Sequence, residues 1–361
     1  MGKHKFLLGL GMSCLMVLLA CSFAFAGGAK VLKIGGLFCL KGLGSEAETY
    51  VAQGAQLAVD WINKKGGLTI KGQKYKLKLV VEDVGGTANG ASLAANKMAY
   101  DHKVKFVVGT VVPFMVIAAG TVLEPAKVLR VALYNCGTPA EYGPKTRYMF
   151  VSQDATVEGI APSLQYLREA YPKVKSITYV IPDDGSVPYL GPLFRKIAKK
   201  HGSKVASIAK WAMNTQDSIA FANGWPAATG AMLKVAREMG FKGPVFGCNY
   251  DDPAQIAQIA GKKNSYNFFI HSLVLNHPAM TPMIKMMVKM ARAIQKAQSL
   301  DPTKVRNTWE KMTTIQTIWG PGRMCGRKTY GINHTVCHPI PIAALVKGRV
   351  KWVKWIDVFT E

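Results

Sequence analysis

Apolar and polar positions follow two periodic patterns along residues 31–275, and each pattern predicts a different type of secondary structure. Short apolar runs, or apolar residues at every second position, indicate strands, whereas apolar residues three and four apart indicate helices. Residues 47–64 have the helical spacing, with Val51, Ala55 and Ala58 on one face. In the first half of this region, the predicted strands are 31–37, 75–82, 106–109 and 130–133, and the predicted helices are 47–64, 88–101 and 116–127.

The alternation returns after residues 148–152, which separate the two runs. Strands that alternate with helices predict parallel sheets covered on both faces. The fold class is therefore predicted to be α/β, with two doubly wound parallel-sheet lobes. Ligands of such sheets bind in loops at the carboxyl ends of the strands. The second run has predicted strands 176–181, 204–213, 219–222 and 244–246, and predicted helices 158–171, 189–201 and 228–239.

The last eighty residues depart from this alternation. Helices are predicted at 281–298 and 304–312. Two strands follow at 340–345 and 350–358, joined by a turn at Lys347-Gly348.

The N-terminus has the three parts of a secretory signal. Lys3 and Lys5 precede an apolar stretch at 6–20, and Ala24-Phe25-Ala26 supplies small residues before a cleavage point. A retained anchor needs a longer apolar span, of about 18 residues or more. We therefore expect residues 1–26 to be removed and the protein to be periplasmic.

A second interpretation of the N-terminus stays open. Leu18-Leu19-Ala20-Cys21 is similar to a bacterial lipobox, which would leave the protein lipid-anchored at Cys21. No later segment is long and apolar enough to span a bilayer.

Composition and charge limit the classes of partner that are expected for this protein. Apolar residues make up 49% of the 361 residues, enough for real cores, and the net charge is +25. Lys and Arg are scattered without basic runs, so a nucleic-acid partner is not expected, although a polyanion partner remains an alternative. Cysteine spacing lacks the CxxC pairs of zinc knuckles. One disulfide is possible in an oxidising compartment, and Cys325 and Cys337 are the closest pair in sequence.

Enzyme chemistry is not indicated. The chain has no Gly-x-Ser-x-Gly, HExxH or P-loop motif. His334 and His338 would lie about 13 Å apart on a strand, too far to share a metal. We expect no catalytic residues, no cofactor and no metal.

Several short motifs occur in a particular order and spacing along residues 31–358. These motifs are Gln53-Gly-Ala-Gln-Leu-Ala-Val-Asp60, Trp61-Ile-Asn63 with Gly66-Gly67, Leu79-Val-Val-Glu-Asp83, Asn96-Lys97, Val107-Val-Gly109, Asn223-Gly-Trp-Pro226, Leu233, Ala236-Arg-Glu-Met-Gly240, Tyr330-Gly331 and Val346-Lys-Gly348. Their order and spacing resemble those of the Leu/Ile/Val-binding type of periplasmic substrate-binding protein, the type I binding fold of ABC importers.

The resemblance implies two lobes joined by a three-strand hinge, closing on a solute between them. Lobe 1 would comprise residues 27–150 with 276–330, and lobe 2 residues 151–275 with 331–361. The implied partners are a small-molecule solute and ABC permease subunits in the membrane, and the protein is expected to be a monomer. A ligand-sensing module for a membrane receptor uses the same fold and is the alternative.

The resemblance also implies ligand-binding loops in lobe 1. The family's first cleft loop falls on Pro113 and Phe114, where the family's hydroxyl is missing. The next loop contains Asn135, Gly137 and Thr138. Its backbone N–H groups are expected to hold a carboxylate, and Thr138 to add a hydroxyl.

Four further positions complete the implied site. Asp154 lies near the family acid that accepts an α-amino group, and Tyr189 and Trp225 are the implied aromatic contacts of lobe 2. Asn249 stands where the family has a second acid. Because a buried ammonium needs carboxylate partners, the solute is left open between an amino acid and a carboxylate or amide without the amine, with Asp251 or Asp252 as a substitute acid. Asp252-Pro253 is otherwise typical of a helix start.

Two connections are shorter than the family's. Only residues 214–218 separate the predicted strands 204–213 and 219–222, whereas a parallel crossover needs a dozen or more. Between Pro278 and Gln295 there is room for one helix instead of two. The fold is therefore expected to be pared down by internal shortening, and a degenerate, non-binding copy is a further alternative.

Overall fold

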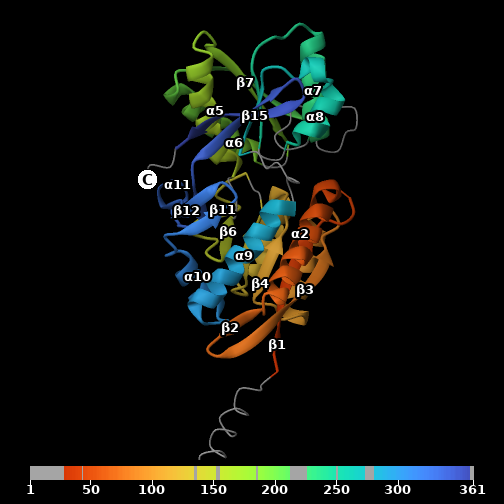
Figure 1. Ribbon diagram of the computed structural model, residues 1–361, viewed down its shortest axis with the longest axis vertical. Coiled ribbons are helices and arrows are strands. Elements are labelled where there is room, and N and C mark those ends of the chain that lie inside the picture. Colours follow the sequence, from red (N-terminus) through yellow and green to blue (C-terminus); the bar gives the residue numbers. More distant parts are fainter. Residues whose placement is uncertain are drawn as a thin grey trace, which may run out of the picture.

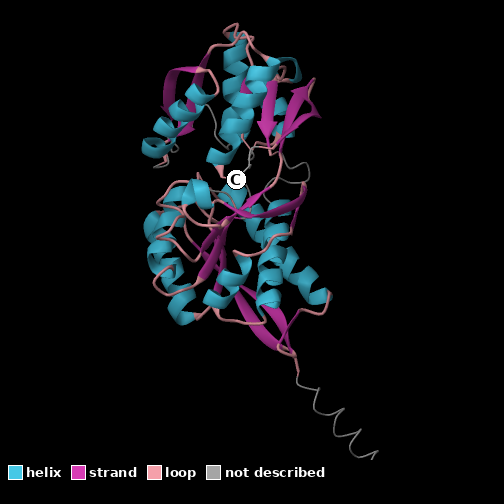
Figure 2. Cartoon of the chain, turned by 90° about the vertical axis from the view of Figure 1, so that its left-hand side faces the viewer, coloured by secondary structure: helices cyan, strands magenta, loops and turns pink. Residues whose placement is uncertain are grey.

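Two α/β lobes lie end to end in the computed structural model (Figure 1). The structure describes residues 28–357 except 43, 134–135, 152–154, 184–185, 212–225, 249–250 and 273–279. The predicted strand 219–222 and the short connection 214–218 lie outside the described residues. Figure 2 shows both helices and strands in each lobe, in agreement with the predicted α/β class.

The sheet of lobe 1 has six strands in the order β2-β3-β1-β4-β5-β6. All neighbours pair in parallel except β2, which forms an antiparallel hairpin with β3. The strands are β1 (Lys30–Phe38), β2 (Leu68–Ile70), β3 (Gln73–Asp83), β4 (Phe106–Gly109), β5 (Leu129–Ala132) and β6 (Met149–Val151).

Helices cover both faces of this sheet. The helices are α2 (Ser45–Lys64), α3 (Ala88–Asn96, continued by a short π-helix over Lys97–Asp101), α4 (Pro113–Leu123), α9 (Met280–Ala297) and α10 (Pro302–Trp309). Phe106 and Val108 of β4 face the core under α2 and α9, whereas Val107 faces the core under α3 and α4. This two-residue period explains why β4 is apolar throughout.

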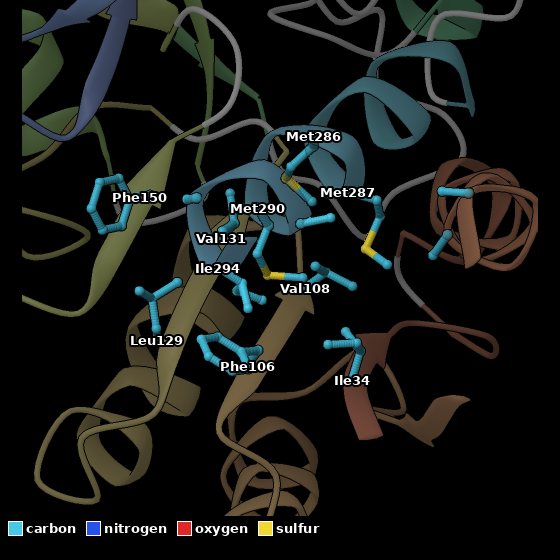
Figure 3. Close-up of a cluster of buried hydrophobic side chains, with 14 of the residues drawn as sticks. Ile34, Phe106, Val108, Leu129, Val131, Phe150, Met286, Met287, Met290 and Ile294 are labelled. Atoms are coloured by element: carbon cyan, nitrogen blue, oxygen red, sulfur yellow. The ribbon is translucent and has the colours of Figure 1, made fainter. Parts of the chain in front are cut away.

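The methionine-rich helix α9 supplies much of the first core. It is a single helix, as predicted from the room available between Pro278 and Gln295. Its apolar side packs onto the strands of lobe 1, and flexible methionine side chains fill the irregular space between helix and sheet. Figure 3 labels the members of this cluster Ile34, Phe106, Val108, Leu129, Val131, Phe150, Met286, Met287, Met290 and Ile294.

Lobe 2 contains two separate sheets. The parallel pair β7 (Ser176–Pro182) and β8 (Lys204–Trp211) forms one, and the order β15-β14-β10-β9 forms the other. The strands of the second sheet are β9 (Val245–Gly247), β10 (Phe268–His271), β14 (Ile340–Val346) and β15 (Arg349–Ile356). The helices are α5 (Thr156–Ala170), α6 (Val187–Lys200), α7 (Pro226–Glu238) and α8 (Pro253–Ala260).

A cavity of about 950 Å³ lies between these two sheets, and the edge strands β7 and β9 both line it. Residues of β7, β9, α5 and α7 line this cavity, and most of the lining side chains are apolar. The chain from the end of β8 to the start of α7, residues 212–225, is the stretch that contains the short predicted connection. Because β7 and β8 form one sheet and β9, β10, β14 and β15 form another, lobe 2 lacks a continuous sheet among its described residues.

We call the segment between α10 and β14 the hinge region; it consists of β11 (Ile315–Thr317), β12 (Gly320–Cys325), the short helix α11 (Arg327–Tyr330) and β13 (Thr335–Cys337). These three strands form an antiparallel sheet. A disulfide joins Cys325 to Cys337 across β12 and β13, so the pair nearest in sequence is bonded. His334 is enclosed beside β6, with Nδ1 2.7 Å from the Met149 carbonyl oxygen and Nε2 2.6 Å from Glu310 Oε1.

Replacing Cys325 and Cys337 together by serine is expected to lower the free energy of unfolding by about 3 kcal/mol, because the bond closes a loop of sequence separation 12. Urea denaturation of the oxidised protein measures this loss. Reductant added to the unaltered protein should reproduce the loss and leave the variant unchanged. Equal midpoints for the oxidised protein and the variant would show that the bond does not stabilise the fold.

Candidate ligand site at the lobe junction

The first predicted loop lies at the start of α4. This helix begins at Pro113, three residues before the predicted start, because proline at the first position presets the helical φ angle. Pro113 is buried, and Phe114 is half-buried against the core formed by α3 and α4. Both residues follow β4, at the carboxyl edge of the sheet.

The carboxylate of Glu48, on α2, binds the loop between β4 and α4. This carboxylate accepts hydrogen bonds from the Cys39 N–H (2.7 Å), the Val111 N–H (3.0 Å) and the Thr110 hydroxyl (2.7 Å). The side chain is completely buried, and burial raises its pKa above the ordinary value although the hydrogen bonds oppose the rise. Glu48 therefore fixes the loops after β1 and β4 together.

The second predicted loop has an internal carboxylate of its own. Glu141 accepts hydrogen bonds from the Cys136 N–H (3.0 Å) and the Thr138 N–H (2.9 Å), and it is completely buried. In this conformation the Thr138 N–H donates to Glu141, and the expectation that this loop holds a solute carboxylate stays a prediction. The Thr138-Pro139-Ala140-Glu141 spacing is that of a capping box, and this signal could have identified Glu141 from the sequence.

A buried arginine balances the charge beside this loop. Arg130 on β5 donates from Nη1 to the Val116 carbonyl oxygen at 2.7 Å. Burial lowers its pKa to about 10, while Glu124 and Glu141 act in the opposite direction, so it stays charged at neutral pH. A Cβ on Gly120 would come within 2.4 Å of the guanidinium, and glycine there makes room for it.

Gly137 brings the lobe 1 loop against lobe 2. Its φ of +83° suits glycine, and a Cβ there would approach Val157 Cγ1 to 2.6 Å and Ala155 Cβ to 3.0 Å at the start of α5. The same Cβ position is 3.3 Å from the Tyr330 hydroxyl. Gly137 therefore lies where the lobe 1 loop, α5 and the hinge helix α11 meet.

Tyr330 connects the hinge to lobe 2. Its hydroxyl donates to Glu158 Oε1 at 3.0 Å, and Glu158 Oε2 accepts from the Ala155 N–H at 3.0 Å. Burial raises the pKa of Tyr330 well above its ordinary value, so the phenol keeps its proton and remains a donor. The sequence indicated Tyr330 only as part of the family resemblance and did not indicate Glu158.

Tyr189 is the described lobe 2 candidate. It lies in the first turn of α6, where its N–H donates to the Ser186 carbonyl oxygen at 3.0 Å, and its ring is half-buried against the core at the lobe junction. Burial raises the pKa of its phenol, which is therefore neutral at pH 7. The other predicted residues, Asn135, Asp154, Trp225 and Asn249, lie outside the described residues.

The acids after Asn249 have separate roles. Asp252 is the N-cap of α8 and accepts from the Ala254 N–H at 2.8 Å, as the Asp-Pro pattern predicted. Asp251 is completely buried and accepts from the Thr229 hydroxyl (2.7 Å) and the Cys248 N–H (2.8 Å). Asp251 thus ties α7 to the end of β9 by internal bonds.

Within the described ranges, no group of three or more His, Cys, Asp and Glu side chains could hold a metal ion. In the same part of the chain, no helix combines the length and apolar character needed to cross a membrane.

Two hinged α/β lobes, with strand-end loops from one and helix starts from the other at their junction, define a two-lobed solute-binding protein. A model of the periplasmic binding protein family matches residues 31–273. The chain belongs to this family, and its fold is the type I fold, so the predicted resemblance is confirmed. The family and the fold are those of solute-binding proteins.

Individual proteins that are similar to this chain support the same family. The Leu/Ile/Val-binding protein BraC3 of Rhizobium johnstonii is 42% identical over 114 residues, which are 31% of this chain and 30% of that protein. This match spans less than a third of the relative's length. The leucine-binding protein LivK of Thermotoga maritima shares the fold with a TM-score of 0.73 and 16% identity over 91% of this chain and 99% of that one. An ABC transporter solute-binding protein of R. palustris, in complex with benzoate, has a TM-score of 0.72 and 14% identity over 91% and 96%.

Proposed function

We propose that this protein is the extracytoplasmic solute-binding component of an ABC importer. It takes up a branched-chain-type amino acid, or a related small carboxylate or amide, by closure of the two lobes. It performs no catalysis, acts as a monomer and delivers its solute to permease subunits. The periplasmic address follows from the predicted signal at residues 1–26, with the Cys21 anchor as the alternative.

The observation that carries this proposal is the meeting of three parts at one junction. The loop after β5, the first turns of α5 and α6, and the hinge helix α11 all contribute there. The proposed contacts are Pro113, Phe114, Asn135, Gly137, Thr138, Asp154, Tyr189, Trp225 and Asn249. A solute at this junction would touch both lobes, and contacts to both favour the closed form.

The solute class depends on two features of the chain. Asn249 replaces a family acid, which weakens the demand for an ammonium group. In the part of lobe 1 that the structure describes, two loop N–H groups that could bind a carboxylate already donate to Glu141. We therefore rank amides and non-amino acids beside amino acids. Leucine and benzoate, in the names of two similar structures, mark the two ends of this range.

A thermal-shift screen of the chain from residue 27 tests this function. The panel contains branched-chain amino acids, aliphatic and aromatic acids, and their amides. A solute at one hundred times its Kd should stabilise the protein by about 2.7 kcal/mol. Scattering should then show a more compact molecule with that solute.

Variants sharpen the screen. Asn249→Asp should move the ranking towards amines, whereas Asn307→Asp, an exposed change in α10, should leave it unaltered. An unchanged ranking would remove Asn249 from the site. Loss of solute uptake on deleting the gene supports import, and intact uptake with a lost response supports the sensing alternative.

A second candidate function is that of a non-binding copy. The observation that favours it is the split sheet of lobe 2 with its cavity of about 950 Å³, since a lobe that lacks a continuous sheet presents its cleft loops less firmly. No thermal shift with any panel member, together with unchanged scattering, would support this candidate against solute binding.

A further inference from the structure

The edge strand β15 of lobe 2 carries two exposed tryptophans side by side. β15 is the last strand in the order β15-β14-β10-β9, and Figure 1 shows it across the upper lobe. Trp352 is 37% exposed and Trp355 is 49% exposed. Their rings stack with centroids 6.0 Å apart. A pair of exposed indole rings is a larger apolar surface than a single exposed residue, and such surfaces mark interaction sites.

A β-bulge places both rings on the same face. Residues three apart on a regular strand point to opposite faces. Here Trp352 pairs with Ala343 and Trp355 pairs with Pro341, so Val353 is an extra residue in the ladder. Because Pro341 and Ala343 share a face of β14, the two tryptophans share one as well.

The strand that carries the pair is strongly basic, and the register places Arg349, Lys351 and Lys354 opposite Val346, Ala344 and Ile342, on the other face from the tryptophans. Residues 346–356 include Lys347, Arg349, Lys351 and Lys354 and contain no Asp or Glu. All four cations are exposed. Lys354 pairs with Glu169 of α5, whereas Lys347, Arg349 and Lys351 form no ion pair with any residue that the structure describes and are available to an outside partner.

A second element adds charge at the turn end. A Cβ on Gly348 would lie 3.0 Å from Lys262 Cγ, so the lysine stem of the short helix after α8 packs on the turn. Lys262 and Lys263 are both exposed. The tryptophan pair therefore continues into a basic turn along one edge of lobe 2.

We propose that this Trp/Lys edge, residues 346–356 with Lys262 and Lys263, docks edge-on on an anionic lipid bilayer surface, so that side chains from both faces of the edge strand reach the headgroups. Tryptophan favours the interface between headgroups and acyl chains, and each lysine or arginine near an anionic surface adds attraction. A second copy of this chain fits less well, since edge-to-edge pairing would bring the same cations together and exposed lysines oppose such pairing. Docking would hold the binding protein beside the membrane, independently of the proposed solute.

Vesicle co-sedimentation of the chain from residue 27 tests the proposal; every described helix and strand lies after that point. With vesicles of mixed phosphatidylglycerol and phosphatidylcholine, we expect binding that Trp352→Ser with Trp355→Ser weakens by about tenfold or more. Arg349→Ser with Lys351→Ser should weaken it by about twentyfold or more. Pure phosphatidylcholine vesicles should bind weakly.

The matched control replaces an exposed tryptophan on another part of the molecule. Trp61 on α2 is also 49% exposed, and Trp61→Ser should leave vesicle binding unchanged. Brominated lipids should quench tryptophan fluorescence in the Trp61 variant and not in the double tryptophan variant. Equal vesicle binding by the unaltered protein, the double tryptophan variant and the Trp61 variant would overturn the proposal. Absence of quenching in the Trp61 variant would overturn it as well. So would self-association that disappears in the double tryptophan variant while vesicle binding is unaffected, since that outcome assigns the edge to a second copy.

Discussion

Replacing Glu48 by alanine is expected to lower the free energy of unfolding by about 3–5 kcal/mol, the largest loss among the single substitutions considered for this protein. Without the carboxylate, the Cys39 and Val111 N–H groups and the Thr110 hydroxyl lose their acceptor in a site closed to water. Each buried donor left unsatisfied costs about 1–3 kcal/mol. Chemical denaturation followed by fluorescence measures the change.

Glu238→Ala is the matched control. Glu238 is exposed on α7, and its loss should change stability by less than about 0.5 kcal/mol. Glu48→Gln keeps one acceptor oxygen but turns an amide NH₂ towards donors, so it should recover only part of the loss. A change below about 1 kcal/mol for Glu48→Ala would show that the loops after β1 and β4 are not held by this carboxylate.

The second large effect concerns pH and Asp251. Burial raises the pKa of this carboxyl from 3.8 to about 7, against the hydrogen bonds from Thr229 and Cys248. Between pH 4 and 7 the unfolded chain has released the proton while the folded chain retains it. The folded state then binds more protons, so stability falls as pH rises through this window.

Asp251→Asn removes this titration, so the variant should not lose stability through Asp251 as pH rises. The stability of the variant minus that of the unaltered protein should rise by up to about 4 kcal/mol from pH 4 to pH 7, at about 1.4 kcal/mol per pH unit. Asp252→Asn is the neighbouring control, because asparagine caps a helix about as well as aspartate. Urea unfolding at each pH gives the difference, and a flat difference for Asp251→Asn would contradict the raised pKa.

Most of the fold could be predicted because its signals are local. The apolar period of 47–64 predicted α2, and the all-apolar run Phe106–Gly109 predicted a strand covered on both faces. The start of α4 was predicted three residues late, because Pro113 and Phe114 were assigned to a loop while proline at the first helical position is favourable.

The candidate site was less predictable. Gly137 could be placed by its loop, but its contact with α5 depends on how the two lobes meet. The occupation of the Thr138 N–H by Glu141 was not anticipated, although the capping-box spacing was present. Glu158 and Tyr330 are 172 positions apart, and no local pattern indicates their hydrogen bond.

The sequence by itself determined the class of this protein: the alternation of strands and helices, the single helix before Gln298, and the closest cysteine pair are all properties of neighbouring residues. The tertiary structure decided which polar groups remain available. Burial and the packing of distant segments set the acceptors of Thr138, Cys39 and Val111, and the bulge at Val353 placed Trp352 beside Trp355. These outcomes depend on contacts between elements, and chain periodicity carries no information about them.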